Sequence, residues 1–165
     1  MKRSALVILW LLTAFCVSAA PTAKKKKPAA KSNEITSVMM YRTVCYGRCP
    51  EYSIEINKDG MATYTGMRFA PDTGIFKKSI GKAKAKEIIN MFIANRADTC
   101  REMYENRIPD VPGLTITIKY PKKTKKIFSA NFGPGFLLEI AEAMDAAAKK
   151  TDKKGWKKTG MPKFE

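Results

Sequence analysis

Histidine is absent from this chain of 165 residues. Its absence excludes Ser-His-Asp and Cys-His nucleophile sites, histidine zinc sites and the commonest general base near neutral pH. The chain also lacks a P-loop, a dinucleotide-binding fingerprint and an EF-hand loop. Its acidic residues are scattered, so no carboxylate pair for glycoside hydrolysis can be named. We therefore expect no metal site and no cofactor, and we favour a protein without enzymatic activity.

Long hydrophobic runs are missing as well. The most apolar stretch, residues 5–17, is shorter than the roughly 20 residues that cross a membrane. It follows two basic residues and ends among small ones, which is typical of a secretory signal peptide over residues 1–19. Phe15 stands before Cys16, where lipoprotein processing requires a small residue, so a lipid anchor is not favoured. We predict export to the periplasm or the medium.

Acidic residues are scarce relative to basic ones: 15 Asp and Glu oppose 31 Lys and Arg, for a formal net charge of +16. Much of the excess lies in a leader (residues 20–33) and a tail (residues 149–165), both predicted to be disordered because they are rich in lysine. The single domain between them, residues 34–148, is only mildly basic, which argues against nucleic-acid binding by the fold. Anionic lipid headgroups or cell-wall polymers would suit the arms, and the alternative is that both arms are solvated spacers. The candidate anion contacts are Lys24, Lys25, Lys26, Lys27, Lys122 and Lys123.

Apolar periodicity between the arms predicts a mixed fold. Alternation is clearest from Leu114 to Tyr120, where every second residue is apolar or aromatic. Apolar residues three and four positions apart predict a helix from Lys82 to Arg96. The expected order is strand 35–44, strand 52–57, strand 61–68, strand 75–80, helix 82–96, strand 114–120, strand 125–130 and helix 136–149. We predict an α+β fold in which a mainly antiparallel sheet of about six strands, in the order ββββαββα, carries two helices on one face.

Cysteine is infrequent, and two of the four cysteines, Cys45 and Cys49, stand close together. An extended strand would hold them about 13 Å apart, whereas a disulfide requires Cα atoms roughly 4.4–6.8 Å apart. If the two pair, the chain must turn between them, and Gly47 is the residue best able to adopt a positive φ there. We favour a structural disulfide, with a redox or metal pair as alternatives, and we expect Cys100 to be unpaired.

The stretch around these cysteines holds a specific arrangement. Arg42 precedes the run Cys45-Tyr46-Gly47-Arg48-Cys49-Pro50-Glu51-Tyr52, a hairpin turn signal follows at Asp59-Gly60, and the returning strand ends in Tyr64-Thr65-Gly66. Together with Asp110-Val111-Pro112, it resembles an uncharacterised bacterial domain-of-unknown-function family, number 6438. The resemblance covers roughly residues 35–148 and implies an exported single domain, with no activity to carry over. Its motif positions in this chain are Arg42, Tyr46, Gly47, Pro50, Tyr52 and Asp110.

Two classes of function remain open. We favour a non-enzymatic exported binding or interaction domain of the cell envelope. Its basic arms would contact an anionic surface, and its sheet or loops would contact an envelope protein or a small ligand. The alternative is a thiol–disulfide redox protein that uses Cys45 and Cys49; nucleic-acid binding through the arms is least favoured. A thiol titration of the native protein separates the first two, because a working couple is accessible whereas a scaffold disulfide resists reduction.

Overall fold

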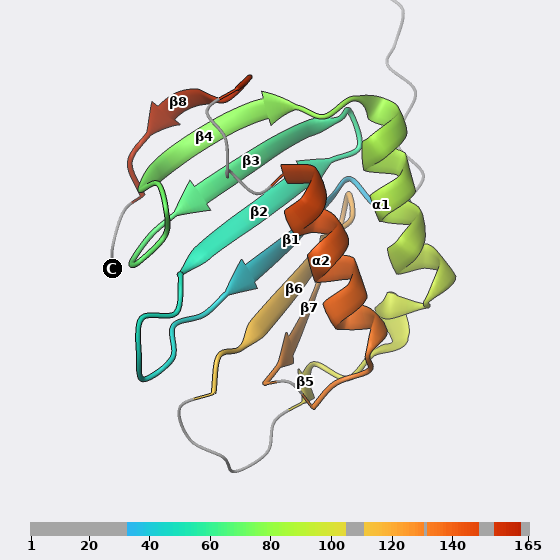
Figure 1. Cartoon of the computed structure of the whole chain (residues 1–165). Coiled ribbons are helices and arrows are strands. Elements are labelled where there is room, and N and C mark those ends of the chain that lie inside the picture. The colour runs from blue at the N-terminus through green and yellow to red at the C-terminus, as the bar shows by residue number, and fades with distance from the viewer. Residues whose placement is uncertain (1–32, 105–110, 131, 149–153, 163–165) are drawn as a thin grey trace, which may run out of the picture.

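The computed structural model describes residues 33–104, 111–130, 132–148 and 154–162. They form an eight-stranded sheet with the strand order β5-β7-β6-β1-β2-β3-β4-β8. Two α-helices pack on one face of this sheet and leave the other face uncovered (Figure 1). The strands are β1 (Ser37–Arg42), β2 (Tyr52–Asn57), β3 (Met61–Gly66), β4 (Gly74–Ser79), β5 (Met103–Tyr104), β6 (Leu114–Lys119), β7 (Thr124–Ser129) and β8 (Lys157–Gly160). The helices are α1 (Lys82–Ala94) and α2 (Phe136–Ala148), and a short 3-10 helix spans Ala97–Thr99.

The predicted α+β class is confirmed, with both helices on the same face. Neighbouring strands are antiparallel except for β5 and β7, which are parallel. The sheet has eight strands instead of the expected six, because β5 and β8 extend its two edges. β5 has two residues and β8 has four, and neither shows an apolar alternation from which a strand could be predicted.

Alternation in the strands decides which sheet face the helices cover. In β2, Tyr52, Ile54 and Ile56 are fully or almost fully buried, whereas the residues between them are half-buried on the open face. The helices complete this core with one apolar stripe each, because residues three and four positions apart share a helix face. The buried helix residues are Ala85, Ile88, Ile89 and Phe92 from α1, and Leu137, Ile140, Ala141, Met144 and Ala148 from α2.

The turn predicted at Asp59-Gly60 joins β2 to β3, so that prediction is confirmed. Gly60 has φ 88°, a backbone conformation that side chains disfavour. A Cβ at this position would also lie 2.4 Å from the backbone carbon of Gly81, just before α1 begins. Glycine is therefore required there for two reasons, since the hairpin packs directly against the start of the helix.

The C-terminal part of the chain corrects one expectation. We expected residues 149–165 to form a disordered tail, but Lys157–Gly160 forms β8 and pairs with β4. The Trp156 ring lies edge-on to Tyr64, with 6.2 Å between ring centres, so the tail contributes an aromatic side chain to the core. Lysine content suggested disorder, and the burial of Trp156 together with the ladder to β4 outweighs it.

Several expectations concern residues outside the described ranges. The predicted signal peptide (residues 1–19), the lysines at 24–27 in the predicted leader, and Asp110 all lie there. Among the residues that the structure describes, neither α-helix is long and apolar enough to span a membrane.

Candidate functional site

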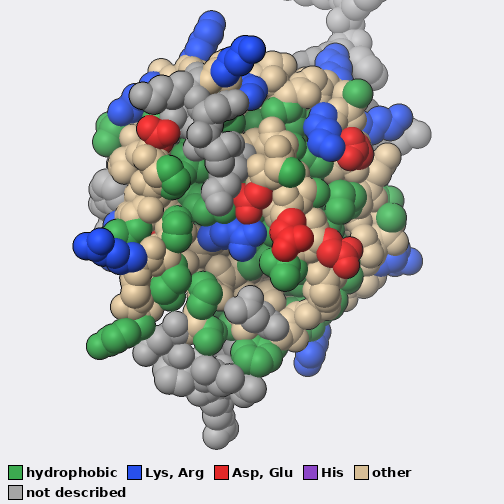
Figure 2. Space-filling model, viewed as in Figure 1, with side chains coloured by type: hydrophobic (Ala, Val, Ile, Leu, Met, Phe, Trp, Pro, Cys, Tyr) green, Lys and Arg blue, Asp and Glu red, His purple; other side chains and the backbone are tan. Residues whose placement is uncertain are grey.

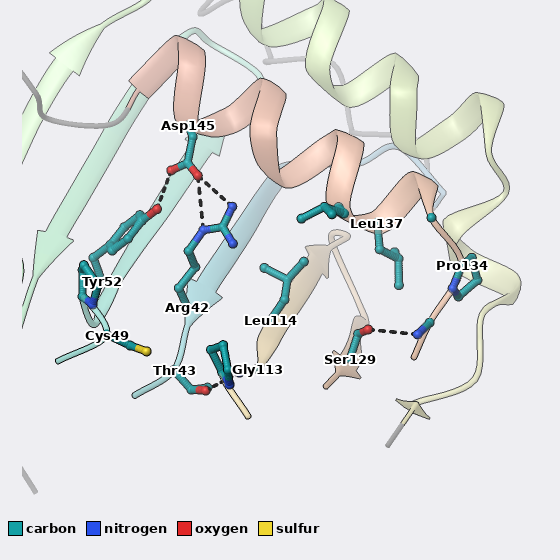
Figure 3. A pocket seen from close by; sticks show the side chains of 15 residues that line it. Arg42, Thr43, Cys49, Tyr52, Gly113, Leu114, Ser129, Pro134, Leu137 and Asp145 are labelled. Atoms are coloured by element: carbon teal, nitrogen blue, oxygen red, sulfur yellow. Dashed lines mark hydrogen bonds and ion pairs between the residues drawn. The ribbon is translucent and has the colours of Figure 1, made fainter. Parts of the chain in front are cut away.

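The signature residues Arg42 and Tyr52 meet at one end of the sheet. They are directly opposite each other in the β1–β2 ladder, and both reach toward α2. Arg42 donates from Nε and Nη2 to Oδ2 of Asp145, at 3.2 Å and 2.8 Å. The Tyr52 hydroxyl donates to the other carboxylate oxygen, Oδ1, at 2.7 Å. One carboxylate on α2 therefore joins the helix to two neighbouring strands (Figure 3).

This cluster is partly withdrawn from water, and its titration behaviour reflects that. Burial and the hydrogen bond to Asp145 raise the pKa of the Tyr52 hydroxyl well above its usual value. Burial acts to lower the pKa of the Arg42 guanidinium, but the interaction with Asp145 outweighs it, so the pKa of Arg42 is raised. Arg42 is thus a cation and Tyr52 a neutral donor over the whole physiological range. The positive charge of Arg42 is balanced inside the cluster by Asp145.

A pocket of about 540 Å³ lies beside this cluster. It occupies the place where β1 and β7 end, β2 and β6 begin, and α2 crosses above them. Its walls include Arg42, Tyr52, Leu114, Ser129, Leu138 and Asp145. On the face shown in Figure 2, acidic side chains gather over α2, and basic side chains lie mostly toward the margin of the molecule. A pocket of this size with mainly apolar walls and few polar groups is typical of a small-ligand site.

Two hydrogen bonds hold the loops at the mouth of the pocket. Thr43 Oγ1 accepts from the backbone N–H of Gly113 at 2.8 Å, and Ser129 Oγ accepts from that of Gly133 at 3.1 Å. A Cβ on Gly113 would lie 2.6 Å from the ring of Phe128, so a larger residue here would force that ring to move. The pocket walls are therefore fixed by backbone contacts on both sides.

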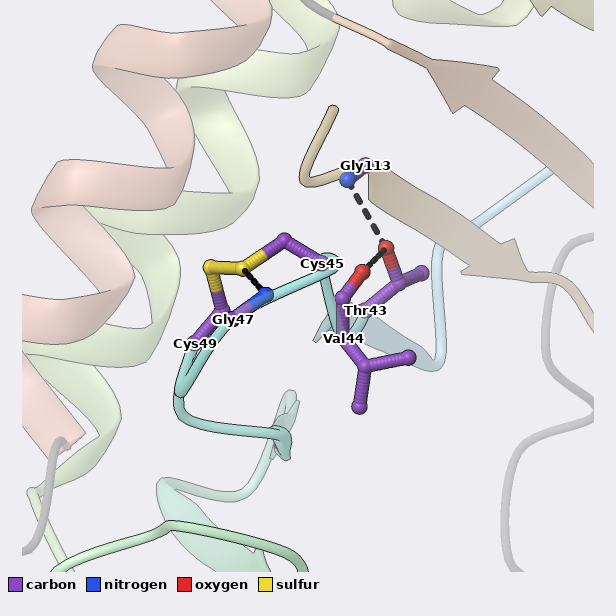
Figure 4. Close-up of a disulfide and its surroundings, with 6 residues drawn as sticks. All are labelled: Thr43, Val44, Cys45, Gly47, Cys49 and Gly113. Carbon is purple, nitrogen blue, oxygen red and sulfur yellow. Dashed lines mark hydrogen bonds between the residues drawn. A yellow bond between two sulfur atoms is a disulfide. The ribbon is translucent and has the colours of Figure 1, made fainter. Parts of the chain in front are cut away.

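The disulfide loop reaches the same pocket through Cys49. Cys45 and Cys49 are joined by a disulfide with their Cα atoms 5.5 Å apart, and Cys49 and Pro50 line the pocket (Figure 4). The backbone N–H of Gly47 faces the Cys45 sulfur at 3.4 Å. The expectation of a positive φ at Gly47 is wrong, because the glycines with positive φ are Gly60, Gly74, Gly81 and Gly155. The loop closes without it, and the remaining described cysteine, Cys100, is free.

Other predicted site residues lie away from the pocket. Tyr46 is 90% exposed at the tip of the disulfide loop and does not line the pocket. Lys122 and Lys123 are exposed on the β6–β7 turn, where the Lys123 ammonium lies 4.9 Å from the centre of the Tyr120 ring. Within the described residues, no three Cys, Asp or Glu side chains are grouped as metal ligands.

Asp145 is the functional candidate that sequence reasoning missed. It borders the apolar stripe of α2, directly after the buried Met144. A carboxylate beside an apolar helix face needs a hydrogen-bonding or charged partner. This need was the signal in the sequence that could have identified Asp145. The partner itself was not predictable, because Arg42 lies 103 residues earlier in the chain.

Comparison with known proteins identifies the family of this chain. No curated protein matches the sequence. Residues 36–153 match the family described as Domain of unknown function (DUF6438), a range that contains both cysteines, the Arg42–Asp145–Tyr52 cluster and both helices. The chain therefore belongs to the DUF6438 family.

Proposed function

We propose that this protein is an exported, non-enzymatic binding domain whose ligand occupies the pocket between the disulfide loop and α2. The observation that carries the proposal is that several signature residues line the same pocket. Four residues of the signature, Arg42, Cys49, Pro50 and Tyr52, line one pocket although they come from two strands and a loop. A binding site at this pocket would account for their grouping around one space.

The chemistry of the walls supports binding over catalysis. Asp145 is the carboxylate among the lining residues, and Arg42 and Tyr52 occupy its two oxygens. Ser129 Oγ accepts a hydrogen bond from the Gly133 backbone, and no histidine exists in the chain to activate a hydroxyl. The polar groups of the pocket are thus engaged in holding its shape.

The same walls define a class of ligand. Because Arg42 is neutralised by Asp145, the pocket offers no unbalanced charge from this pair. Leu114, Leu137 and Leu138 provide apolar surface, and Leu138 is 49% exposed at the mouth. We propose an uncharged, mainly apolar group as the occupant, either a small molecule or a side chain of an envelope protein.

A fragment screen followed by ¹⁵N–¹H NMR tests the pocket directly. We expect apolar fragments to shift the amides of Cys49, Gly113 and Leu138, and the L138W variant to abolish those shifts by filling the mouth. I93W is the matched control, because Ile93 is an equally exposed apolar residue (55%) on α1 and does not line this pocket. Fragments that bind elsewhere, or that bind L138W as well as the native chain, would contradict the proposal.

Export is tested separately. We propose that residues 1–19 are removed and that the protein works outside the cytoplasm, which the sequence pattern of that segment supports. Mass spectrometry of protein recovered from the envelope fraction should find an N-terminus near residue 20. Recovery of the uncleaved chain from the cytoplasm would overturn this part.

One observation favours the redox alternative: Cys49 lines the pocket, so an occupant would lie against a sulfur atom. A redox protein would need a mildly oxidising reduction potential for the Cys45–Cys49 pair. Structural disulfides generally have reduction potentials below about −300 mV. The protein is equilibrated with glutathione or dithiothreitol buffers, and mass spectrometry measures the reduced fraction. This measurement distinguishes a structural disulfide from a redox couple. We expect reduction only under the most reducing conditions, and reduction near −200 mV would favour the redox protein.

A further inference from the structure

The strand that sequence analysis missed, β8, brings lysines together at the sheet edge. Lys77 of β4 stands directly opposite Lys157 of β8, and Phe76 stands opposite Lys158. Lys77, Lys157 and Lys158 are exposed, and Lys78 is half-buried. Like charges directly opposite each other in an antiparallel pair destabilise it. β8 therefore pairs with β4 against an electrostatic cost.

Within the described part of the chain, these lysines form no ion pair with an acidic side chain. Seven ion pairs occur there, and none involves a lysine of β4, of β8 or Lys154. On the other side of the sheet, by contrast, Lys119 of β6 lies 2.8 Å from Glu55, and Lys125 of β7 lies 3.7 Å from Glu102. The β4–β8 edge thus carries a concentration of uncompensated positive charge.

Aromatic contacts hold β8 in place and orient some of these lysines. The Lys78 ammonium lies 5.7 Å from the centre of the Trp156 ring, and the Lys158 ammonium lies 5.8 Å from that of Phe76. These rings belong to the core cluster through Tyr64. The charges of Lys78 and Lys158 are therefore positioned before any partner arrives, which lowers the entropic cost of binding.

Protection of a sheet edge does not explain the whole pattern. Lysine on an exposed edge strand discourages pairing with other chains, and that accounts for Lys157 and Lys158. It does not account for Lys77, because β4 is no longer an edge strand once β8 is paired. An anionic ligand bound between the opposed lysines of the two strands would explain why both are present.

We propose that the β4–β8 edge binds a linear, phosphate-bearing polyanion. Lys77 and Lys157 project from the uncovered sheet face, while Lys78 and Lys158 lie on the helix-covered side with their aromatic partners. The charges therefore lie on both faces of the sheet edge, where a flexible chain can contact them together and a flat bilayer cannot. Bound phosphates relieve the Lys77–Lys157 repulsion, so binding of the polyanion and docking of β8 reinforce each other.

Binding is tested with inorganic polyphosphate as the probe and the full chain as the protein. We expect K157E to weaken binding by about tenfold or more at physiological salt, and to reduce the slope of log affinity against log salt by about one. K126E is the matched control. It makes the same change of charge on β7, at the other side of the sheet. Equal losses in K157E and K126E would show that net charge alone attracts the polymer, and would overturn the proposal.

Stability gives a second, independent readout. We expect K77E and K157E each to raise the melting temperature, because either creates an opposite-charge pair, whereas the double variant K77E/K157E restores repulsion and loses the gain. Polyphosphate should raise the melting temperature of the native chain and of neither single variant. Trp156 is one of two tryptophans, and its fluorescence should show tighter β8 docking with polyphosphate.

The opposite results contradict the proposal. Single variants that melt lower than the native chain, or whose effects add in the double variant, would show that the two lysines do not repel each other across the ladder. Binding to vesicles that contain phosphatidylglycerol is the last measurement. Tight vesicle binding together with no polyphosphate binding would assign this edge to a membrane surface instead.

Discussion

Asp145 has more structural consequences than any other single residue of the site. Its two carboxylate oxygens accept hydrogen bonds from β1 and β2, so it attaches α2 to both strands. The Arg42 and Asp145 side chains are 29% and 17% exposed, so the pair is shielded from water without being completely dry. Loss of one partner from such a pair leaves a poorly hydrated charge behind, and this costs more than loss of an exposed pair.

We predict that D145N destabilises the protein by about 2 kcal/mol, because Arg42 loses its counter-charge and two charge-assisted hydrogen bonds weaken. Urea unfolding of the two proteins measures the difference. E142Q is the matched control, since Glu142 is an exposed carboxylate on the same helix and should change stability by less than about 0.5 kcal/mol. A D145N protein as stable as E142Q would show that the cluster contributes nothing to the attachment of α2.

Among the elements, β8 depends on one aromatic residue and one short ladder. Its four residues make few hydrogen bonds, and Trp156 supplies the contact with the core. A strand of this kind is expected to open more easily than the central strands β1, β2 and β6. The local stability of β8 is therefore expected to depend on Trp156 more than on the stability of the whole fold.

We predict that W156A costs about 1–3 kcal/mol, less than removal of a fully buried aromatic residue, because Trp156 is only half-buried. Limited proteolysis should then cleave near β8 faster than in the native chain. F69A is a suitable comparison, since Phe69 is 55% exposed and outside the core cluster. If β8 were cleaved equally fast in both variants, Trp156 would not be its anchor.

At the scale of the whole molecule, charged and aromatic groups set how stability responds to pH. Burial acts to raise the pKa of Glu51, but hydrogen bonds from Tyr41 and Arg68 outweigh it and lower the pKa below 4.5. Burial and the bond to Glu51 raise the pKa of Tyr41 to about 12, and burial raises that of Tyr64 to about 12. The lowered carboxyl pKa favours the folded state above pH 4.5, and the raised phenol pKa values favour it below pH 10.

We therefore predict a stability plateau from about pH 5 to about pH 10. Stability should fall as the pH drops below 4.5, where Glu51 becomes protonated, and again as the pH rises from 10 to 12, where the tyrosines ionise. Urea midpoints measured across this range test the prediction, and Y41F should lose less stability than the native chain between pH 10 and 12. A steep change between pH 6 and 8 would contradict it, since the chain has no histidine.

Local patterns predicted most of this molecule, and contacts distant in sequence were the part that escaped. The turn at Asp59-Gly60 and the apolar stripe of α1 were predictable because neighbouring residues alone specify them. The partnership of Arg42 with Asp145 needs the full register of sheet and helix. β8 escaped because its lysines resemble a solvated tail, and the ring of Tyr64 against which Trp156 packs lies far away in the sequence.

The disulfide ring has a further consequence for how the chain assembles as it is made. Closing it requires only the five consecutive residues from Cys45 to Cys49, whereas the contact of Thr36 with Lys119 joins residues 83 positions apart. The ring can therefore close before the rest of the sheet has formed. The ring then fixes the corner between β1 and β2, so those two strands can find each other first and offer a template to the rest.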